Sequence, residues 1–251
     1  MLNNATLSKL REMKLSTMAK KLEWQLSQPD MQSLSFEERF GMLVDAEWLG
    51  KRNRRTDRLI RQAGFRFPAS VEDIDYHGKH GITKADIMRL CSGTFIQRKQ
   101  NLILTGPTGI GKTYTACALG RCACNMDVAT QYTRIGDMFF ALDEARSSKT
   151  YLSFKNRLRG VPLLILDDWG MKAFTMSESH DLNELFELRY DQASTVILSQ
   201  VPHSSWHELF PDPTLADAIM DRFIHNAYKY NLTGESMRKT IAMRGFESDD
   251  A

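Results

Sequence analysis

A glycine-rich stretch is the strongest chemical signal in the sequence. It reads GPTGIGKT, with an apolar run before it and a helical pattern, Tyr114–Asn125, after it; its residues are Gly106, Pro107, Thr108, Gly109, Ile110, Gly111, Lys112 and Thr113. Glycines let the backbone wrap closely around an anion, and the following helix points its first N–H groups at the same place. We therefore predict that this loop binds ATP, with Lys112 on the β- and γ-phosphates and the Thr113 hydroxyl on Mg²⁺.

Two adjacent carboxylates, Asp167 and Asp168, follow the apolar run LLIL. In a parallel sheet, ligands bind beyond the carboxyl ends of the strands. We expect Asp167 to bind Mg²⁺, directly or through water, and Asp168 to orient or deprotonate the attacking water.

A second polar strand end follows the run TVIL, at Ser199 and Gln200. If its strand lies between the strands of the two motifs, one of these residues faces the γ-phosphate or the water, and the sequence leaves open which; an ordinary polar strand end is the alternative.

The elements that must position these groups are short apolar runs alternating with helical patterns, which predict a parallel sheet covered on both faces. We predict an α/β fold, a P-loop sheet flanked by helices over residues 96–251, joined by a connector at 67–95 to a small all-helical domain at 1–66. The candidate strands are Asn101–Thr105, Val128–Thr133, Leu163–Asp167, Thr195–Ser199 and Tyr228–Leu232.

Two apolar stripes at helical spacing dominate the first 66 residues, and for both we predict ordinary core packing. Ser35 and Glu38 form a capping box in front of the second stripe. A third helical stretch, rich in cations, covers roughly 50 to 63. The stripes consist of Leu15, Met18, Leu22 and Leu26, and of Phe36, Phe40, Leu43, Val44 and Trp48.

The positive charge of the chain is concentrated near its beginning. Residues 1–66 hold 13 lysines and arginines against 8 acids, although the formal charge of the whole chain is only +2. Six cations on or beside one helical stripe suit the phosphate backbone of duplex DNA, without base readout: Lys51, Arg52, Arg54, Arg55, Arg58 and Arg61. A second basic set is Lys149, Lys155, Arg157 and Arg159. For both sets a solvated face is the alternative.

Composition excludes several classes of protein. With 251 residues, 42% hydrophobic and 25% charged, the chain is neither collagen-like nor wholly disordered. The four cysteines show no CxxC spacing, so we expect reduced thiols. No apolar run approaches the roughly 18 residues that span a bilayer, and the first residues lack the apolar core of a signal peptide. We expect a cytoplasmic protein without a membrane partner.

Taken together, these motifs resemble the AAA+ ATPases, and more narrowly the IstB-like transposition helpers, which are related to DnaC-type helicase loaders. The phosphate loop alone is widespread, but its combination with the other segments is specific. The resemblance is carried by GPTGIGKT, LLILDDWG, TVILSQVP, AIMDRFIHNA and NLTGESMRK, and by the passage RRTDRLIRQAGFRFPASVEDIDY that precedes the ATPase part.

The resemblance implies roles for two further arginines. Arg222 matches the arginine finger that such ATPases donate to the γ-phosphate of a neighbouring subunit, which implies a homo-oligomer; a surface pair with Asp217 or Asp221 is the alternative. Arg238 would contact the nucleotide as a second sensor, a solvated tail arginine being the alternative. Only 19 residues follow Leu232, so no full C-terminal lid is expected.

The implied function is that of an ATP-dependent, DNA-binding transposition helper. It assembles on target DNA and delivers it to a transposase, and ATP hydrolysis controls disassembly. A replicative helicase loader, which differs in what its N-terminal helices bind, is the first alternative. A small-molecule kinase is disfavoured because the sequence has no arginine-rich lid segment. A purely architectural DNA binder with an idle nucleotide site would show no ATP turnover.

Overall fold

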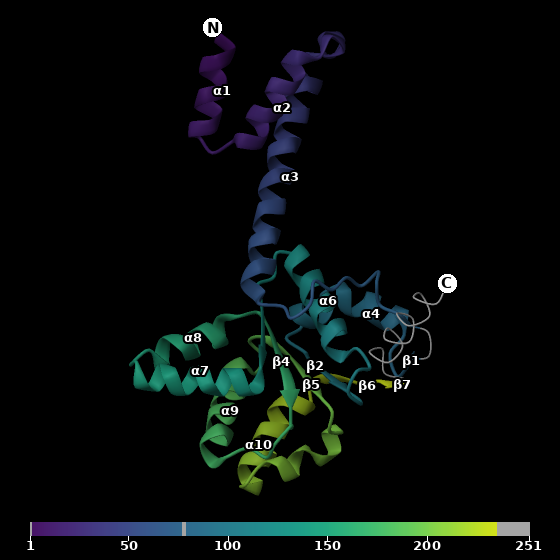
Figure 1. The fold of residues 1–251 in the computed structure, drawn as a ribbon, viewed down its shortest axis with the longest axis vertical. Coiled ribbons are helices and arrows are strands. Elements are labelled where there is room, and N and C mark those ends of the chain that lie inside the picture. The colour runs from purple at the N-terminus through teal and green to yellow at the C-terminus, as the bar shows by residue number, and fades with distance from the viewer. Residues whose placement is uncertain (1, 77–78, 235–251) are drawn as a thin grey trace, which may run out of the picture. The chain divides into compact units, whose positions relative to one another are not determined.

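A computed structural model describes residues 2–76 and 79–234, and the chain divides into two compact units, residues 1–58 and 59–251 (Figure 1). The first unit is helical. Its elements are α1 (Leu2–Glu12), α2 (Ser16–Ser27), the 3-10 helix η1 (Pro29–Ser33) and the larger part of α3 (Phe36–Ala63), which continues past the unit boundary.

The predicted helical stretches 36–48 and 50–63 form one continuous helix, α3. Gly50 does not break it, and it serves close packing: a Cβ atom there would lie 2.5 Å from the Thr17 hydroxyl of α2. The predicted capping box is confirmed, since Ser35 N donates to Glu38 Oε2 at 2.8 Å and Glu38 N donates to Ser35 Oγ at 3.2 Å. Its two hydrogen bonds fix the start of α3.

The predicted core packing of the second apolar stripe is wrong for most of its residues. Leu43 is buried, but Phe36, Phe40, Val44 and Trp48 are between 42% and 68% exposed. The rings of Phe36 and Phe40 stack on each other, with centroids 5.7 Å apart. In the first stripe, Leu26 is also exposed. Helical spacing therefore identified the helices correctly, but not the face that each one buries.

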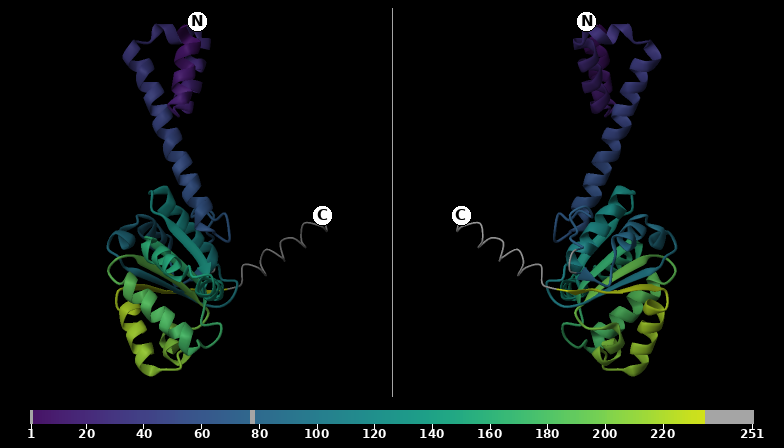
Figure 2. Two further views of the ribbon diagram at one scale, coloured as in Figure 1. Left: turned by 90° about the vertical axis from the view of Figure 1, so that its left-hand side faces the viewer. Right: turned by 90° about the vertical axis from the view of Figure 1, so that its right-hand side faces the viewer.

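The second unit is built around a five-stranded parallel sheet in the order β3-β4-β5-β2-β6. Figure 2 shows this unit from two further sides. All five candidate strands are present, and their ends differ from the predicted ones by no more than two residues. The strands are β2 (Asn101–Thr105), β3 (Thr130–Arg134), β4 (Leu163–Trp169), β5 (Ser194–Ser199) and β6 (Ala227–Asn231).

Helices cover both faces of this sheet (Figure 1). Helices α4 and α6 pack on one face, and α7, α9 and α10 pack on the other; α8 packs between α7 and α9. The helices are α4 (Lys84–Cys91), α5 (Thr94–Gln97), α6 (Lys112–Asn125), α7 (Ile135–Ser147), α8 (Tyr151–Gly160), α9 (Met176–Arg189), the 3-10 helix η2 (His203–Leu209) and α10 (Pro213–Ile224).

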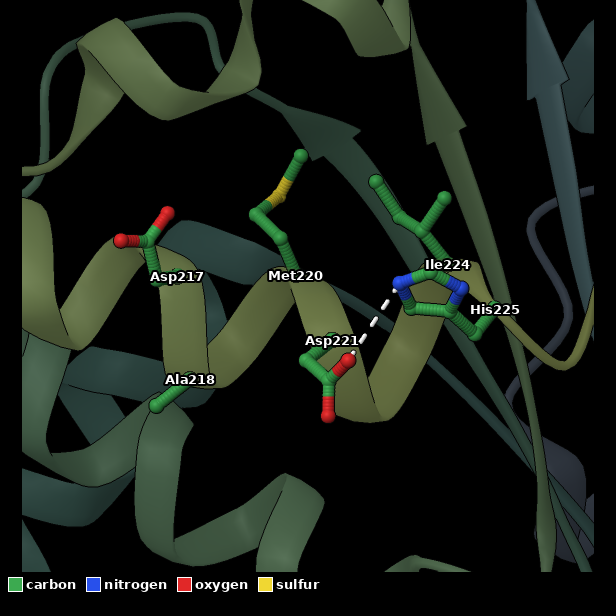
Figure 3. A pocket seen from close by; sticks show the side chains of 6 residues that line it. All are labelled: Asp217, Ala218, Met220, Asp221, Ile224 and His225. Carbon is green, nitrogen blue, oxygen red and sulfur yellow. Dashed lines mark ion pairs between the residues drawn. The ribbon is translucent and has the colours of Figure 1, made fainter.

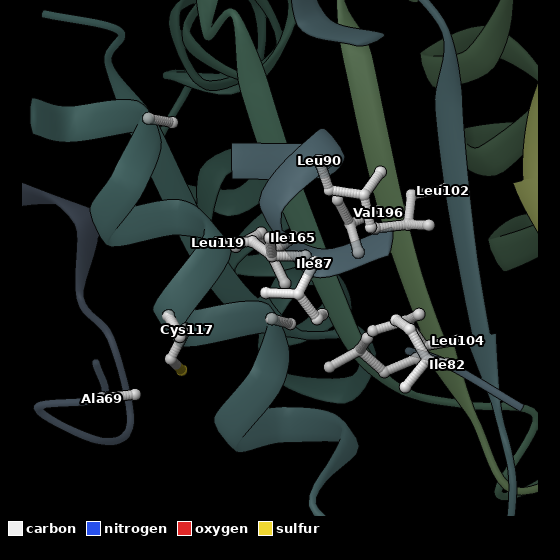
Figure 4. Packing of buried hydrophobic residues seen from close by; sticks show 14 of the residues in the cluster. Ala69, Ile82, Ile87, Leu90, Leu102, Leu104, Cys117, Leu119, Ile165 and Val196 are labelled. Atoms are coloured by element: carbon white, nitrogen blue, oxygen red, sulfur yellow. The ribbon is translucent and has the colours of Figure 1, made fainter. Parts of the chain in front are cut away.

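Alternating residues of each central strand supply two separate cores. On β2, Leu102 and Leu104 join the cluster under α4 and α6 (Figure 4), whereas Ile103 joins the cluster on the opposite face. All three are at most 1% exposed. Burying one such side chain contributes roughly 1.5–3 kcal/mol, so the strand runs that lack polar residues hold the sheet together from both sides.

The segment predicted as a connector, 67–95, contributes Ile74, Ile82 and Ile87 to the first of these clusters. Two short antiparallel strands, β1 (Lys79–His80) and β7 (Thr233–Gly234), pair beside the sheet. The predicted fold class, a P-loop parallel sheet with flanking helices and a helical N-terminal part, is confirmed.

Candidate nucleotide-binding site

The glycine-rich loop joins the carboxyl end of β2 to the first turn of α6. Gly106, Gly109 and Gly111 have positive φ angles of 143°, 85° and 96°, which side chains with a Cβ atom rarely tolerate. A Cβ atom on Gly106 would lie 2.2 Å from the carbonyl oxygen of Leu232. The loop therefore needs glycine on steric grounds, and it leaves the N-terminus of α6 open to an anion. This cradle fits the phosphates of a nucleotide.

Backbone carbonyl groups of the phosphate loop bind the side-chain ammonium of Lys112. Its ammonium donates to the carbonyl oxygens of Gly106 at 2.6 Å and of Pro107 at 2.9 Å, and the residue is 8% exposed. Burial lowers the pKa of Lys112, and the nearby carboxylates of Asp167 and Asp168 oppose that shift. An ammonium has three donors, so one is left for a phosphate oxygen.

Asp167 connects three elements through its carboxylate. Its Oδ2 accepts hydrogen bonds from the Thr113 hydroxyl of α6 and from the Tyr132 hydroxyl of β3, each at 2.8 Å, and its Oδ1 accepts from Asp168 N at 2.8 Å. The residue is only 3% exposed. A hydroxyl and a carboxylate held together are suitable oxygen ligands for Mg²⁺, so the donor set fits the predicted metal.

Asp168 lies in a different environment from its neighbour. Its φ of 60° falls in the left-handed region, next to an irregularity in the pairing of β4 with β5. Its side chain is 39% exposed, and Oδ2 lies 3.5 Å from Nε of Arg134 at the end of β3. Asp167 is thus enclosed, while Asp168 keeps access to water, as a group that orients or deprotonates water requires.

The structure separates the roles of Ser199 and Gln200 at the end of β5, which lies between β2 and β4 as predicted. Ser199 is buried; its hydroxyl donates to Trp169 O at 2.9 Å and accepts from Val201 N at 3.0 Å. Gln200 is exposed, and its Oε1 accepts a hydrogen bond from the Thr108 hydroxyl of the loop at 2.5 Å. Ser199 reaches the phosphate loop only through its backbone carbonyl, which accepts from Gly106 N at 3.2 Å, so among these two side chains it is that of Gln200 that contacts the loop.

Arg222 lies near the amino ends of the central strands, whereas the phosphate loop lies at their carboxyl ends. It lines a small cavity together with Asn101, the first residue of β2, and Thr195, near the start of β5. The phosphate loop follows Thr105, the last residue of β2. The length of the strand thus separates Arg222 from the phosphate site of its own chain.

Neither alternative partner of Arg222, Asp217 or Asp221, is the one found in the structure. Asp217 contacts His207 at 3.2 Å and Asp221 contacts His225 at 3.3 Å, the latter on the exposed side of α10 (Figure 3). Arg222 instead forms an ion pair with Glu187 on α9, and its Nη1 also donates to Asn183 Oδ1 at 3.3 Å and to Ala218 O at 3.0 Å. Its side chain is still 28% exposed.

The six cationic residues of α3 are all exposed, but they differ in their partners. Arg54 donates to Glu47 Oε1 at 2.9 Å and to the Thr17 hydroxyl at 2.8 Å, within the first unit. The Arg52 guanidinium lies 5.5 Å from the centre of the Trp48 ring. Arg54 therefore has a structural task, and DNA binding by Lys51, Arg52, Arg54, Arg55, Arg58 and Arg61 stays a prediction.

The second basic set divides in the same way. Lys155 forms an ion pair with Glu184 of α9, while the Arg157 guanidinium lies 4.8 Å from the centre of the Phe154 ring. Lys149 and Arg159 are exposed. Arg238, the predicted second sensor, lies outside the described residues, as do residues 235–251, in which no full lid is expected.

Sequence reasoning missed Tyr132 and Arg134, the two residues of β3 that contact the aspartates. Strand β3 pairs with β4, with Arg134 opposite Asp167. The signal available was the polar sequence TQYTR of a strand next to the aspartate strand. That signal points to the aspartates only when the order of the strands in the sheet is known, and local sequence patterns do not give this order.

Comparison with known proteins decides the family. A family model described as IstB-like ATP binding protein matches residues 8–244. The chain belongs to the IstB-like ATP-binding family. Within it, the insertion sequence ATP-binding protein y4pL of Sinorhizobium fredii is 41% identical over 239 residues, which cover 95% of this chain and 98% of the relative. The predicted resemblance is confirmed, and with it the enzyme class: this IstB-like protein is an ATPase.

Solved structures show the same fold at low sequence identity. The structure of DnaI is similar with a TM-score of 0.56 and 21% identity, over 71% of this chain and 92% of that one. The DnaC helicase loader is similar with a TM-score of 0.52 and 14% identity, over 66% of this chain and 98% of that one. These similarities confirm the fold, which the IstB-like chain shares with DnaI and with the DnaC helicase loader. Within the described residues, no helix combines the length and apolarity needed to cross a membrane.

Proposed function

We propose that this IstB-like protein is an ATP-dependent, DNA-binding helper of transposition, which assembles on target DNA, delivers it to a transposase and comes apart when ATP is hydrolysed. Membership of a family whose relatives belong to insertion sequences supports the transposition context. Assembly is supported by the position of Arg222. The length of β2 separates this residue from the phosphate loop of its own chain, so it can act only on the site of another subunit.

The residues of the site divide the work of hydrolysis among them. Lys112 and the open N-terminus of α6 bind the phosphates, and Thr113 and Asp167 would hold Mg²⁺, which would supply positive charge beside the phosphate oxygens. Asp168, exposed to water, acts as the base that orients or deprotonates the attacking water. Gln200, linked to Thr108 of the loop, is the residue that faces the γ-phosphate.

Arg222 completes the site of a neighbouring subunit. Its guanidinium would leave Glu187 and neutralise charge at the neighbour's γ-phosphate, an effect worth about 10³–10⁵ in rate in other NTPases. A nucleotide that contacts two subunits binds the assembled state more tightly than the separate chains, and for that reason it favours assembly. Hydrolysis removes the γ-phosphate, and the preference for the assembled state decreases.

The DNA contacts are assigned to the exposed cations of α3 and of the α7–α8 region. Lys51, Arg58 and Arg61 on α3, and Lys149, Arg157 and Arg159 near α8, are all exposed. Such contacts bind phosphates irrespective of sequence, so the affinity for duplex DNA decreases steeply with salt concentration.

The test is to measure assembly on duplex DNA with ATP, with a non-hydrolysable analogue and without nucleotide, by sedimentation and electron microscopy. We expect large DNA-bound particles only with nucleotide, and we expect them to persist with the analogue. Lys112→Ala should lose nucleotide binding and assembly, whereas Lys20→Ala, which removes an exposed lysine of α2, should keep both. Asp168→Asn should bind ATP, assemble and remain assembled. Normal assembly of Lys112→Ala would contradict the proposal.

A helicase loader is the alternative function with the same fold. The protein that the chain binds, a transposase or a replicative helicase, distinguishes a transposition helper from a loader. Immobilised full-length protein with ATP and DNA should retain an insertion-sequence transposase and not a replicative helicase. Retention of the helicase alone would favour the loader.

A further inference from the structure

The four cysteines fall into two classes by exposure. Cys117 and Cys124 of α6 are 1% and 0% exposed, and Cys117 belongs to the core between α6 and the sheet (Figure 4). Cys91 and Cys122 are partly exposed, and all four are free thiols. A reagent in solution can therefore reach Cys91 and Cys122 in the folded protein, while the other two are protected.

The two accessible cysteines contact each other through their sulfurs. Cys91 is the last residue of α4, Cys122 lies near the end of α6, and these two helices pack together. The two Sγ atoms are 2.9 Å apart. A disulfide bond is about 2.05 Å long, so the sulfurs need to approach by less than about 1 Å to form one.

The surroundings of the pair favour reaction at Cys122. The hydrogen bond between the sulfurs lowers the pKa of Cys122 and raises that of Cys91. Burial and Glu72 act against the shift of Cys122, and Arg121 supports it. The lowered pKa favours the thiolate of Cys122, which is the nucleophilic form of cysteine, and Cys91 lies beside it as a second thiol.

We propose that Cys91 and Cys122 form a reversible modification site, a dithiol that a peroxide oxidises to an intramolecular disulfide. The Cys122 thiolate attacks one oxygen of hydrogen peroxide, so that an S–O bond forms, the O–O bond breaks and the released hydroxide takes up a proton to give water. The Cys91 sulfur then attacks the sulfenic sulfur, an S–S bond forms, and the S–O bond breaks with release of a second water. The protein loses two electrons and two protons in total, and a dithiol reductant reverses the change.

The disulfide would connect the phosphate-loop helix to the edge of the sheet. Helix α6 begins with Lys112 and Thr113, and α4 is bound to strand β6 because Arg89 donates to the Tyr230 hydroxyl at 2.8 Å. The cross-link closes a loop between residues 31 positions apart, which restricts the unfolded chain. The two thiols need neither DNA nor a partner protein to form the disulfide, so this site is independent of the proposed function.

The first test needs no variant. The full-length native protein is treated with hydrogen peroxide, its remaining thiols are alkylated, and its peptides are analysed by mass spectrometry. We expect a linked Cys91–Cys122 peptide pair that has lost two hydrogens. Cys117 and Cys124 should remain thiols and should react with the alkylating reagent only after the protein is unfolded. We also expect the melting temperature to rise by about 5 °C and to return after treatment with dithiothreitol. Peroxide treatment that yields Cys122 sulfinic acid without a cross-link would overturn the proposal.

Single variants and an arsenical supply the controls. In Cys91→Ser the sulfenic form of Cys122 should persist long enough to be trapped by dimedone, and the melting temperature should not rise. Phenylarsine oxide bridges two neighbouring thiols with loss of one water and needs no oxidation. The wild-type protein should bind one arsenical, and Cys91→Ser and Cys122→Ser should bind none. Equal binding by all three proteins would show that the two sulfurs do not act as a pair.

Discussion

The Tyr132 hydroxyl donates a 2.8 Å hydrogen bond to the same Asp167 oxygen, Oδ2, that accepts the hydroxyl of Thr113. The contact joins strand β3 to the first turn of α6 across the end of β4. Burial and the charge of Asp167 raise the pKa of Tyr132, so the phenol stays protonated and remains a donor. Tyr132 thus orients the carboxylate to which we assign Mg²⁺.

Replacing Tyr132 with phenylalanine should weaken metal binding more than catalysis. The variant removes one hydrogen bond, worth about 1 kcal/mol, so we expect the Mg²⁺ concentration for half-maximal ATP turnover to rise about fivefold, with little change at saturating Mg²⁺. Tyr151→Phe is the matched control, because Tyr151 donates to a different carboxylate, Asp181, at 3.1 Å. An unchanged Mg²⁺ requirement in Tyr132→Phe would remove Tyr132 from the site.

The neighbours Ser199 and Gln200 should respond to substitution in opposite ways. Gln200→Ala should reduce ATP turnover by about 10²-fold, as loss of one preorganised donor does elsewhere, and leave the free energy of unfolding almost unchanged. Ser199→Ala leaves a buried carbonyl and a backbone N–H without partners, and should therefore destabilise the protein by about 1–3 kcal/mol. Steady-state kinetics and urea unfolding of both variants check this. The reverse pattern would assign the phosphate contact to Ser199.

Subunit mixing tests whether Arg222 acts on a neighbour. Arg222→Ala and Asp168→Asn should each lose about 10³-fold in turnover when alone. When the two are mixed on DNA, turnover should partly recover, because an Arg222→Ala subunit keeps its own site and receives the arginine from its neighbour. The double variant mixed with Arg222→Ala is the control and should show no recovery. If the mixture of single variants stays inactive, Arg222 does not act between subunits.

The parts of the molecule that the sequence predicted well are those that local patterns determine. The loop Gly106–Thr113 lies between a strand and a helix because its glycines exclude other conformations and its flanking runs have clear periodicity. The capping box at Ser35 was predictable because both of its hydrogen bonds lie within four residues. Such features depend on neighbours in the chain, which the sequence displays directly.

Features that depend on distant residues were missed. Tyr132 reaches Asp167 only because β3 and β4 are adjacent in the sheet. Periodicity placed Phe36 and Phe40 in a core, yet both are exposed, whereas the acidic residue Glu47 of the same helix is buried, at 4% exposure. It is buried because it binds two backbone N–H groups at the start of α2. A pattern of apolar residues carries no information about such a partner.

Glu47 should make the stability of the first unit depend on pH. Burial by itself raises the pKa of Glu47, but hydrogen bonds from Met18 N, Arg54 and Thr17 N together hold it below the ordinary value of 4.5. The unfolded chain therefore binds a proton more readily than the folded one, and the stabilisation is complete above about pH 4.5 and is lost as the pH falls through the lower, folded value. Glu47→Gln should destabilise α2 by about 1–3 kcal/mol at neutral pH, seen as faster amide hydrogen exchange in Ser16–Ser27, and this difference should decrease in acid. Glu37→Gln, at an exposed position of α3, is the control and should leave the amide exchange of Ser16–Ser27 unchanged. If the faster exchange in Glu47→Gln stayed constant below pH 4, the charge of Glu47 would not be the cause of the protection.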